Sequence, residues 1–394
     1  MRKYSFVIPA YNYKEYLVNC LESLNHQIGF GAEDYEVVVV DDGSNDGTRD
    51  IIEKMDFSFP LNYIYIERTE KSCRNVARNT GWRNAGGEII IFLDADMILQ
   101  KDFLRNLEMC YEMSHEIFVV GLRFMLHESV SHDQIKDGSV FSRLGSTQKP
   151  DIKYLEERHF LFHKISYNTA SFHNPWIYFY SCNVSVPKKY LLLTGGFNEK
   201  LHGWGFDDQE LGYRLFNAGL RMIINQKLEG LHQFHGEVYG VSPSTQRVLE
   251  WHRNIHHAYK LNKDIRKQIP KLKLIVCYAL KKITWMNRIN HKVLQKHRIQ
   301  IKNKNQIEAC KETVKALAAA KKNEIMVYDH VEDSDLHIWI QFLGRTESIV
   351  KYFPASRVMS EDSIKKYEKY LKKTYPKVRA IYLIKMAYKA FIHA

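Results

Sequence analysis

The sequence predicts an α/β fold with a mostly parallel central sheet flanked by helices. Apolar runs rich in Val and Ile are typical of strands buried on both faces. They alternate with stretches whose apolar residues have helical spacing, and this rhythm gives right-handed βαβ units and a parallel sheet. The predicted strands are residues 4–8, 35–40, 61–66 and 88–93, and the predicted helices are residues 13–26, 45–55 and 72–83.

The fourth predicted strand ends in two carboxylates, Asp94 and Asp96, separated by the small Ala95. Side chains alternate along an extended chain, so both carboxylates are expected to point the same way. In open α/β sheets ligands bind at the carboxyl ends of strands, and hard oxygen ligands suit Mg²⁺ or Mn²⁺ carrying a substrate phosphate. The simpler alternative is that the two Asp end a strand and cap the next turn.

Length and composition are those of a globular intracellular protein. The 394 residues suffice for one large domain and a smaller one. Six scattered cysteines without a Cys-x-x-Cys pair indicate free thiols of a reducing cytosol, not a disulfide framework or a zinc site. No secretory signal and no apolar run long enough to span a bilayer are present. We therefore expect a cytoplasmic protein.

The net charge of +12 is concentrated in one segment. Residues 253–324 contain 19 Lys or Arg against 4 Asp or Glu. Interleaved apolar residues make this segment suited to peripheral contact with an anionic membrane or an acidic acceptor, although a solvated helical face explains it almost as well. A nucleic-acid-binding protein is the third interpretation, but no RNA- or DNA-binding signature is present and nucleic acid is not an expected partner.

Two nucleotide-binding folds are excluded by missing motifs. No Gly-x-Gly-x-x-Gly follows the first strand, and no Gly-x-x-x-x-Gly-Lys-Ser/Thr occurs in the chain. Four other segments are present in a fixed order: Val-Ile-Pro-Ala-Tyr-Asn at 7–12, Val-Val-Asp-Asp-Gly-Ser-Asn-Asp-Gly-Thr at 39–48, Val-Ala-Arg-Asn-Thr-Gly at 76–81 and Phe-Leu-Asp-Ala-Asp at 92–96.

Together these segments resemble a family 2 glycosyltransferase of the GT-A fold, over roughly the first 240 residues. The resemblance implies a nucleotide-sugar donor, usually UDP-linked, and a divalent metal, Mn²⁺ or Mg²⁺, at the Asp-x-Asp motif. It also implies that Asp41 accepts the imide N–H of uracil, although residues 41–48 can also be read simply as a turn with a helix cap. The donor is expected to contact the end of the first strand, at Pro9, Ala10, Tyr11 and Asn12.

Within this group, Pro9 and Ala10 form a wall, and Tyr11 offers a ring face on which uracil can stack. Arg74 and Arg78 lie one turn apart on a predicted helix and are within reach of a diphosphate. A structural ion pair is an equally good interpretation of Arg78.

A second resemblance begins at residue 195. Gly-Gly-Phe-Asn-Glu at 195–199 and Trp-Gly-Phe-Asp-Asp at 204–208 are similar to the C-terminal catalytic motif of galactosyl- and N-acetylgalactosaminyltransferases and of chondroitin-type polymerases. Asn198 stands where Asp is usual and Asp207 where Glu is usual. The indole of Trp204 suits the apolar face of a sugar ring. Asp207 and Asp208 start a predicted helix, so helix capping is the alternative for this pair.

The resemblance also implies a histidine that completes the metal site. His232 is followed by Gln, as is common there, and His235 is the fallback. The expected metal ligands are therefore Asp96, His232 and Asp94, with Asp94 alternatively holding the ribose. Imidazole beside carboxylate is a suitable ligand set for Mn²⁺.

The expected function is that of an inverting, metal-dependent glycosyltransferase in polysaccharide or glycopeptide biosynthesis. It would move a sugar of the Gal, GalNAc, Glc or GlcNAc type from UDP to a hydroxyl or other nucleophile of a saccharide, lipid-linked saccharide or peptide. Asp208 is the expected general base. Because an ordinary Asp has a pKa of about 3.9, it must accept the proton late in the reaction. A catalytically inactive sugar-nucleotide-binding scaffold is the alternative, and the intact Asp94, Asp96 and Asp208 argue against it.

The expected domains are a catalytic domain at 1–243, with an insertion at 127–176 over the active site, and an additional basic, mainly helical C-terminal domain at 244–394. Helices are expected at 207–215, 245–262 and 360–375. Strands are expected at 118–124, 178–187, 221–225, 324–331 and 336–343.

Overall fold

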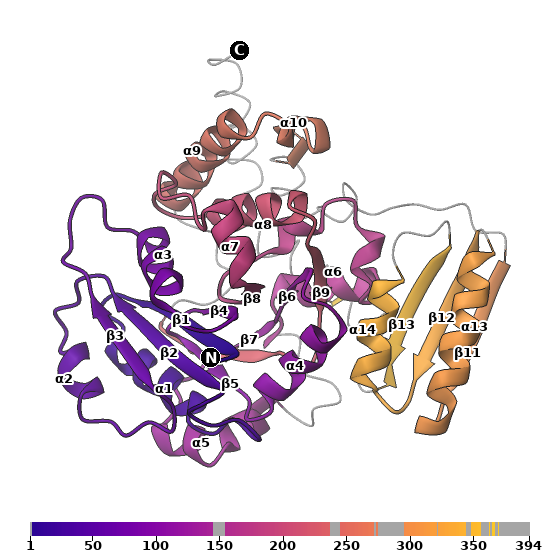
Figure 1. Ribbon diagram of the computed structural model, residues 1–394, viewed down its shortest axis with the longest axis horizontal. Helices are drawn as coiled ribbons and strands as arrows, with labels where there is room; N and C mark the ends of the chain where they lie inside the picture. Colours follow the sequence, from indigo (N-terminus) through magenta and orange to yellow (C-terminus); the bar gives the residue numbers. More distant parts are fainter. Residues whose placement is uncertain are drawn as a thin grey trace.

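A seven-stranded, mostly parallel sheet forms the centre of the protein (Figure 1). The computed structural model describes residues 2–144, 154–236, 245–271, 273–274, 295–320, 322–343, 348–355, 362, 365–366 and 369. The strand order is β3-β2-β1-β4-β8-β6-β9, and β8 runs antiparallel to both of its neighbours. The strands are β1 (Tyr4–Ala10), β2 (Tyr35–Asp41), β3 (Leu61–Tyr65), β4 (Ile89–Leu93), β6 (Ile117–Val120), β8 (Asn183–Pro187) and β9 (Arg221–Ile224).

Helices cover both faces of this sheet, so the predicted fold class is confirmed. In β1, Val7 packs into one core cluster while Phe6 and Ile8 pack into the other, because successive side chains of a strand point to opposite faces. The first cluster contains side chains of α3, α7 and α8, and the second contains side chains of α1, α2 and α4. These helices are α1 (Lys14–Leu24), α2 (Thr48–Ile52), α3 (Arg74–Asn84), α4 (Phe103–Met113), α7 (Lys188–Thr194) and α8 (Asp207–Asn217).

A second, three-stranded sheet joins distant parts of the chain beside the end of β4. Its order is β5 (Met97–Leu99), β10 (Gly230–His232) and β7 (Arg123–Met125). β10 pairs antiparallel with β5, and His232 lies opposite Met97. This register places His232 next to the Asp-x-Asp motif, although more than 130 residues separate them in the sequence.

The strand predicted at 118–124 is divided between the two sheets. β6 ends at Val120, and β7 begins at Arg123. Gly121 lies between them, where a Cβ would come within 2.5 Å of both the Asn183 side chain and the Leu228 carbonyl oxygen. The chain can therefore cross from one sheet to the other only with a residue that has no side chain.

Part of the predicted insertion at 127–176 belongs to the main core. Phe162, Phe172 and Trp176 are fully buried in the same cluster as β4 and β8. The large aromatic residues that obscured any periodicity in the sequence are thus core residues. The helices here are α5 (His132–Lys136), η1 (Ser139–Leu144), α6 (Glu157–Lys164), η3 (Thr169–Ser171) and η4 (Pro175–Tyr178).

Two helices after residue 243 pack on the catalytic core. They are α9 (Thr245–Leu261) and α10 (Ile265–Gln268), and they lie above α8 in Figure 1. Trp251, Ile255 and Tyr259 are buried in the cluster that contains α8. We therefore propose a domain boundary after residue 274 in place of the one expected at 243. Within the described residues, no helix combines the length and apolar character needed to cross a bilayer.

The C-terminal unit is a small parallel α/β sheet and not a mainly helical domain in the part that the structure describes. Its three strands have the order β11-β12-β13, and all pair in parallel. Residues 275–294 of the basic segment and most of the helix predicted at 360–375 lie outside the described residues. The elements are β11 (Gln295–Ile301), η5 (Lys304–Gln306), α13 (Ile307–Ala319), β12 (Asn323–Asp329), α14 (Ser334–Phe342) and β13 (Ile349–Pro354).

The strand predicted at 336–343 is wrong, because these residues form the helix α14. Leu336 and Ile340 pack into the core of the C-terminal unit, whereas Ile338 packs into the core of the main sheet. The helix is apolar on two faces because it lies between two cores, and such a pattern cannot be told from a buried strand by periodicity alone. The Asp333 side chain accepts from the Leu336 N–H and caps the helix.

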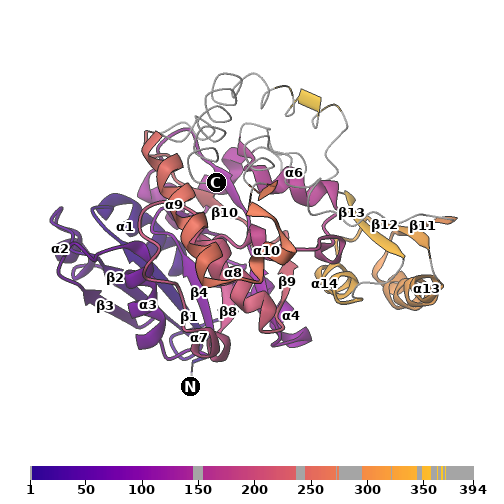
Figure 2. The ribbon, with the colours of Figure 1, turned by 90° about the horizontal axis from the view of Figure 1, so that it is seen from above.

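The C-terminal unit lies against the β9 edge of the main sheet (Figures 1 and 2). The Gln341 amide accepts a hydrogen bond from the Ile224 N–H at 3.0 Å and donates one to the Ile224 carbonyl at 2.8 Å. It thereby replaces the partner strand that this edge lacks. The Asn168 side chain also donates to the Val350 carbonyl of β13, at 3.0 Å.

Candidate active site

The Asp-x-Asp motif lies at a turn and not on an extended strand. β4 ends at Leu93, and the Met97 N–H donates back to the Asp94 carbonyl at 3.1 Å. Asp94 and Asp96 consequently face different partners, which corrects the expectation that both point the same way. Asp94 pairs with Arg78 at 3.0 Å, and Asp96 faces His232 at 3.3 Å and His235 at 3.9 Å.

Asp96, His232 and His235 form a cluster whose ligand atoms all lie within 4.8 Å of one another. The sequence predicted Asp96 with His232 and kept His235 as the fallback, whereas the structure brings both imidazoles to the same carboxylate. It is the one group of three such ligands found among the described residues, and Asp94 is not part of it. Tyr13 and Tyr16 pack against the His235 ring.

The chemistry of this cluster fits a divalent cation. Burial, together with the charge of Asp94, raises the pKa of Asp96 to about 7. Burial, together with Arg123 and His235, lowers the pKa of His232 to about 3, so its imidazole is neutral at physiological pH. The Asp96 Oδ1 atom is buried and has no hydrogen-bond partner. One carboxylate with a free oxygen and two imidazoles form a suitable ligand set for Mn²⁺ and similar metals.

The predicted nucleotide-binding residues gather at the ends of β1 and β2. The buried Asp41 accepts from the Ser44 N–H at 2.7 Å and from the Tyr63 hydroxyl. Asn12 has a left-handed backbone and bonds to the loop after β2. Each Asp41 oxygen keeps a further lone pair for a ligand N–H.

The Tyr11 ring has a partner that the sequence did not predict. The guanidinium carbon of Arg68 lies 3.6 Å from the ring centroid, and Arg68 also pairs with Asp42 at 2.9 Å. Tyr11 remains 41% exposed, so one part of the predicted stacking surface faces solvent. Pro9 and Ala10 are the last two residues of β1.

The two arginines of α3 occupy different environments. Arg78 is buried and lies 3.0 Å from Asp94, 3.6 Å from Asp207 and 3.8 Å from Asp208. These contacts favour the ion-pair interpretation of Arg78. Arg74 is half exposed and donates to the Gly203 carbonyl at 3.2 Å, which leaves it accessible to an anionic ligand.

Asp207 and Asp208 begin α8, as predicted. The turn before them needs Gly203, Gly205 and Phe206 in left-handed conformations, and this turn directs both carboxylates towards Arg78. Burial, together with the charge of Asp207, raises the pKa of Asp208 to about 6. The Asp208 Oδ1 atom is buried without a hydrogen-bond partner, which is unlike a carboxylate whose role is only to cap a helix.

The loop that carries Trp204 is held by α9, a helix with no predicted role in the site. The Glu250 carboxylate accepts from the Trp204 N–H at 2.8 Å, Arg253 donates to the His202 carbonyl at 2.8 Å, and Asn254 donates to the Gly205 carbonyl at 2.9 Å. A Cβ at Gly203 would lie 2.7 Å from the Glu250 carboxyl carbon. The helical spacing of residues 250, 253 and 254 indicates that they share one face of α9, but the sequence does not show what that face contacts.

A group of charged residues lies near the cluster of Asp96, His232 and His235. Arg123 donates to Glu156 at 3.0 Å, and Glu156 also pairs with Arg158 at 2.6 Å. Arg123 lies on β7 opposite Gly230 of β10, two residues before His232, and its charge contributes to the lowered pKa of His232. Because the sequence around these residues has no recognisable motif, they could not be selected in advance.

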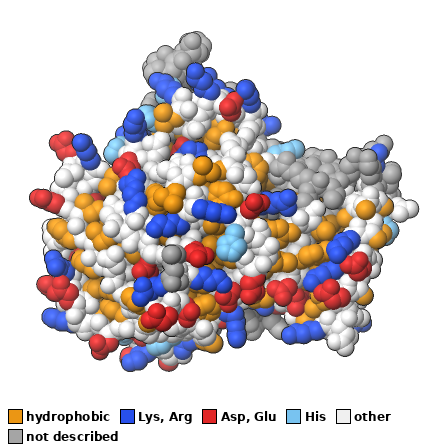
Figure 3. All heavy atoms as spheres, in the orientation of Figure 1, with side chains coloured by type: hydrophobic (Ala, Val, Ile, Leu, Met, Phe, Trp, Pro, Cys, Tyr) orange, Lys and Arg blue, Asp and Glu red, His pale blue; other side chains and the backbone are white. Residues whose placement is uncertain are grey.

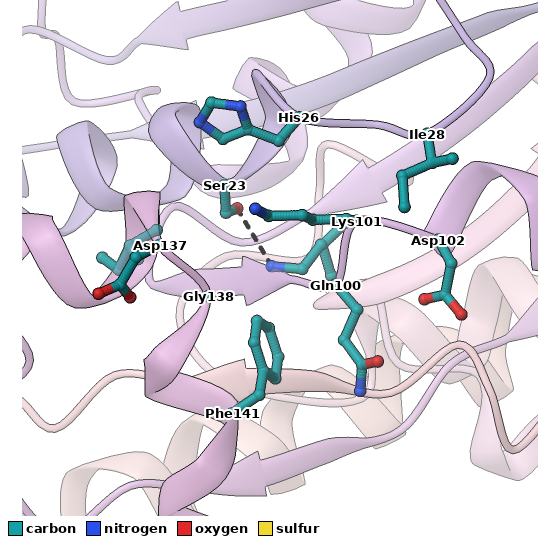
Figure 4. Close-up of a pocket in the computed structure, with 11 residues that line it drawn as sticks. Ser23, His26, Ile28, Gln100, Lys101, Asp102, Asp137, Gly138 and Phe141 are labelled. Atoms are coloured by element: carbon teal, nitrogen blue, oxygen red, sulfur yellow. Dashed lines mark hydrogen bonds between the residues drawn. The ribbon is translucent and has the colours of Figure 1, made fainter.

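A cavity of about 360 Å³ lies elsewhere, between the end of α1, the β5–α4 turn and η1 (Figure 4). Lys101, His26 and Phe141 line it, and none of the predicted site residues does. It is therefore separate from the candidate active site.

Comparisons with known proteins agree on the class of domain. Residues 5–173 match the profile described as glycosyl transferase family 2, and residues 163–236 match that described as N-terminal domain of galactosyltransferase. The "Uncharacterized glycosyltransferase YfnE" of Bacillus subtilis (strain 168) is 33% identical over 261 residues, which cover 59% of this chain and 65% of that protein.

Chondroitin synthase of Escherichia coli is 27% identical over 260 residues, which cover 62% of this chain and 36% of that protein. The chain thus spans less than two thirds of the length of each of these relatives. Among solved structures, S. aureus TarS 1–349 in complex with UDP-GlcNAc is 19% identical, with a TM-score of 0.49 and coverage of 70% of this chain and 73% of that one.

Proposed function

We propose that this chain is a family 2 glycosyltransferase that transfers a sugar from a UDP-linked donor to a saccharide or peptide acceptor, with inversion at the anomeric carbon. The observation that carries the proposal is a pair of carboxylates, Asp96 and Asp208, that each keep one buried oxygen without a hydrogen-bond partner. Asp96 lies beside two imidazoles, and Asp208 lies at the start of α8, 3.8 Å from Arg78. Asp96 would be part of the cation site, and Asp208 would be the proton acceptor.

The donor would bind across the ends of β1, β2 and β4. Uracil would stack near Tyr11 and donate its imide N–H to Asp41, with Arg68 on the exposed side. Asp96, His232 and His235 would hold a divalent cation, either Mn²⁺ or Mg²⁺, and Arg74 is the accessible cation for the diphosphate. When bound, such a cation supplies Lewis-acid neutralisation of the leaving diphosphate.

The acceptor's proton would pass to Asp208. Its carboxylate is already destabilised by burial and by Asp207, so it is a stronger base than an exposed Asp. Arg78 holds Asp207 and Asp208 at fixed distances from Asp94. Proton transfer late in the attack is consistent with a base whose pKa stays well below that of an alcohol.

The names of relatives support the type of donor. Validoxylamine A glucosyltransferase of Streptomyces hygroscopicus is 28% identical over 255 residues, and the poly(ribitol-phosphate) β-N-acetylglucosaminyltransferase TarS of Staphylococcus aureus is 30% identical over 138 residues. We therefore place UDP-Glc and UDP-GlcNAc first among candidate donors, together with UDP-Gal and UDP-GalNAc.

A donor panel tests this proposal. The chain is incubated with each of the four UDP-sugars and Mn²⁺, with EDTA as a parallel condition, and UDP release is measured. We expect release from one or two donors and at least tenfold less release with EDTA. A chain that binds UDP but releases none from any donor, with a mixture of saccharide acceptors present, would instead be a binding scaffold.

A further inference from the structure

The outer face of α9 is a basic stripe that starts at the active-site loop. Arg253, His256 and Lys260 are exposed on successive turns, and the exposed Lys263 and Arg266 follow directly. We call these five residues the α9 stripe. Residues 245–274 contain eight Lys or Arg against two Asp or Glu. In the space-filling view, Lys and Arg side chains gather over α9 and α10 (Figure 3).

The three cations at the C-terminal end of the stripe have no acidic partner among the described residues. Within the described part of the chain, no carboxylate lies within ion-pair distance of Lys260, Lys263 or Arg266, whereas Lys267 pairs with Asp264 at 2.7 Å. Lys271 contacts His256 Nδ1 at 2.9 Å, and its pKa is lowered by burial and by Arg266 and Lys260. Crowded like charges are unfavourable, and a bound anion would relieve them.

The stripe is connected to the catalytic loop by direct contacts. Arg253, its first member, donates to the His202 carbonyl, two residues before Trp204. From Arg253 to Lys260 the stripe extends about 10 Å along the helix, at 1.5 Å per residue. A chain molecule lying on these cations would therefore have one end at Trp204.

We propose that the α9 stripe binds the acceptor and that the acceptor is an anionic saccharide chain carrying phosphate or carboxylate groups. This inference rests on the proposed function and adds the acceptor class to it. A membrane surface fits less well, because a helix that lies on a bilayer presents a continuous apolar face. The exposed Leu249 and Leu261 are at opposite ends of α9 instead.

A matched pair of triple variants tests the proposal. The stripe variant is Lys260→Ala/Lys263→Ala/Arg266→Ala. The control is Arg298→Ala/Lys302→Ala/Lys304→Ala, which removes the same charge from exposed positions on the C-terminal unit. Acceptors are oligosaccharides of equal length that are neutral, carboxylated or phosphorylated, and the donor is the one that releases UDP with the wild-type chain.

We expect wild type to use a phosphorylated or carboxylated acceptor with a lower KM than the neutral one, and the two anionic arms identify which group is preferred. The stripe variant should raise that KM about tenfold, because each of three exposed contacts contributes modestly. The control should leave it within twofold, and added salt should reduce the difference.

Equal use of neutral and anionic acceptors by wild type would overturn the inference while leaving the proposed function intact. So would a stripe variant that behaves like the control, which would make the stripe a solvated face. A stripe variant that loses sedimentation with phosphatidylglycerol vesicles but keeps its acceptor KM would assign the surface to a membrane and also overturn the proposal. The proposed function fails separately, if wild type releases no UDP from any donor.

Discussion

Asp96 and Asp329 are both buried aspartates beside the carboxyl end of an inner strand, one in the main sheet and one in the C-terminal sheet. Asp329, which ends β12, accepts three backbone N–H groups from the turn that follows it and the hydroxyl of Tyr352 at 2.7 Å. Asp96 faces two imidazoles and keeps a buried oxygen without a partner. The first carboxylate is fully satisfied by its own chain, and the second is not.

The position of an Asp in an α/β unit therefore does not by itself identify a ligand site. Buried polar atoms are nearly always hydrogen-bonded, so a buried oxygen without a partner needs an explanation. Asp208 has such an atom as well. We therefore propose functional roles for Asp96 and Asp208 and a structural role for Asp329, and substitution of each residue tests its proposed role.

The largest effect is expected at Asp208. Asp208→Asn keeps the size of the side chain but removes the proton acceptor, so the rate of sugar transfer should fall about 10²–10⁴-fold while UDP binding persists. Asp207→Asn should weaken binding of donor or acceptor more than the chemical step. Steady-state kinetics of both variants check this. Near wild-type transfer by Asp208→Asn with an inactive Asp207→Asn would show that the two roles are reversed.

Substitution of Asp329 is expected to lower stability and to leave the rate of sugar transfer unchanged. Asp329→Ala leaves three N–H groups and the Tyr352 hydroxyl without their acceptor, so the free energy of unfolding should fall by about 1–3 kcal/mol. Urea denaturation measures this, with Glu312→Ala on the exposed face of α13 as the control, where less than about 0.5 kcal/mol is expected. Transfer per folded molecule should stay the same. If Asp329→Ala abolishes UDP release without loss of stability, the comparison with Asp96 is wrong.

The pH dependence of sugar transfer tests the role of Asp208 as the proton acceptor, with a smaller expected effect than the substitutions above. Asp208 must be ionised to accept a proton, and its pKa is raised to about 6 by burial and Asp207. With saturating Mn²⁺, kcat should therefore fall as the pH is lowered through 6. A profile that is flat from pH 8 to pH 5 would assign the proton to another group.

The smallest effect concerns stability. The pKa of Asp208 in the folded protein, about 6, exceeds its ordinary value of 3.8, so the ionised carboxylate destabilises the fold above pH 6 and not below pH 4. Asp208→Asn should accordingly raise Tm relative to wild type at pH 8, and the gain should vanish at pH 4. A variant that is less stable at pH 8 would mean that the ion pair with Arg78 outweighs the cost of burial.

The strands β1, β2 and β4 could be predicted from the sequence because each is a buried apolar run with polar ends. α14 could not, because a short helix between two cores is apolar on both sides. The short strand β5 was missed for a related reason: Met97 to Leu99 gain their partner only from β10, far along the chain.

In the candidate site, Asp96, His232 and Asp208 could be selected from the sequence because they belong to ordered motifs, and their catalytic and metal-binding roles stay predictions. The equivalence of His235 with His232 depends on how the chain turns after β10, and the contact of Arg68 with Tyr11 depends on a loop. The hydrogen bonds between α9 and the Trp204 loop join segments about 50 residues apart in the sequence, and no local sequence pattern predicts such contacts.

We propose that Asp96, His232 and His235 make nucleotide binding depend on a divalent cation. Isothermal titration of UDP into the wild type, with Mn²⁺ and then with EDTA, tests it most directly, with Asp96→Ala and Asp329→Ala measured in parallel. We predict that EDTA and Asp96→Ala each abolish the Mn²⁺-dependent part of the affinity, while Asp329→Ala, studied below its melting temperature, retains it. Equal UDP affinity with Mn²⁺, with EDTA and in Asp96→Ala would contradict the assignment.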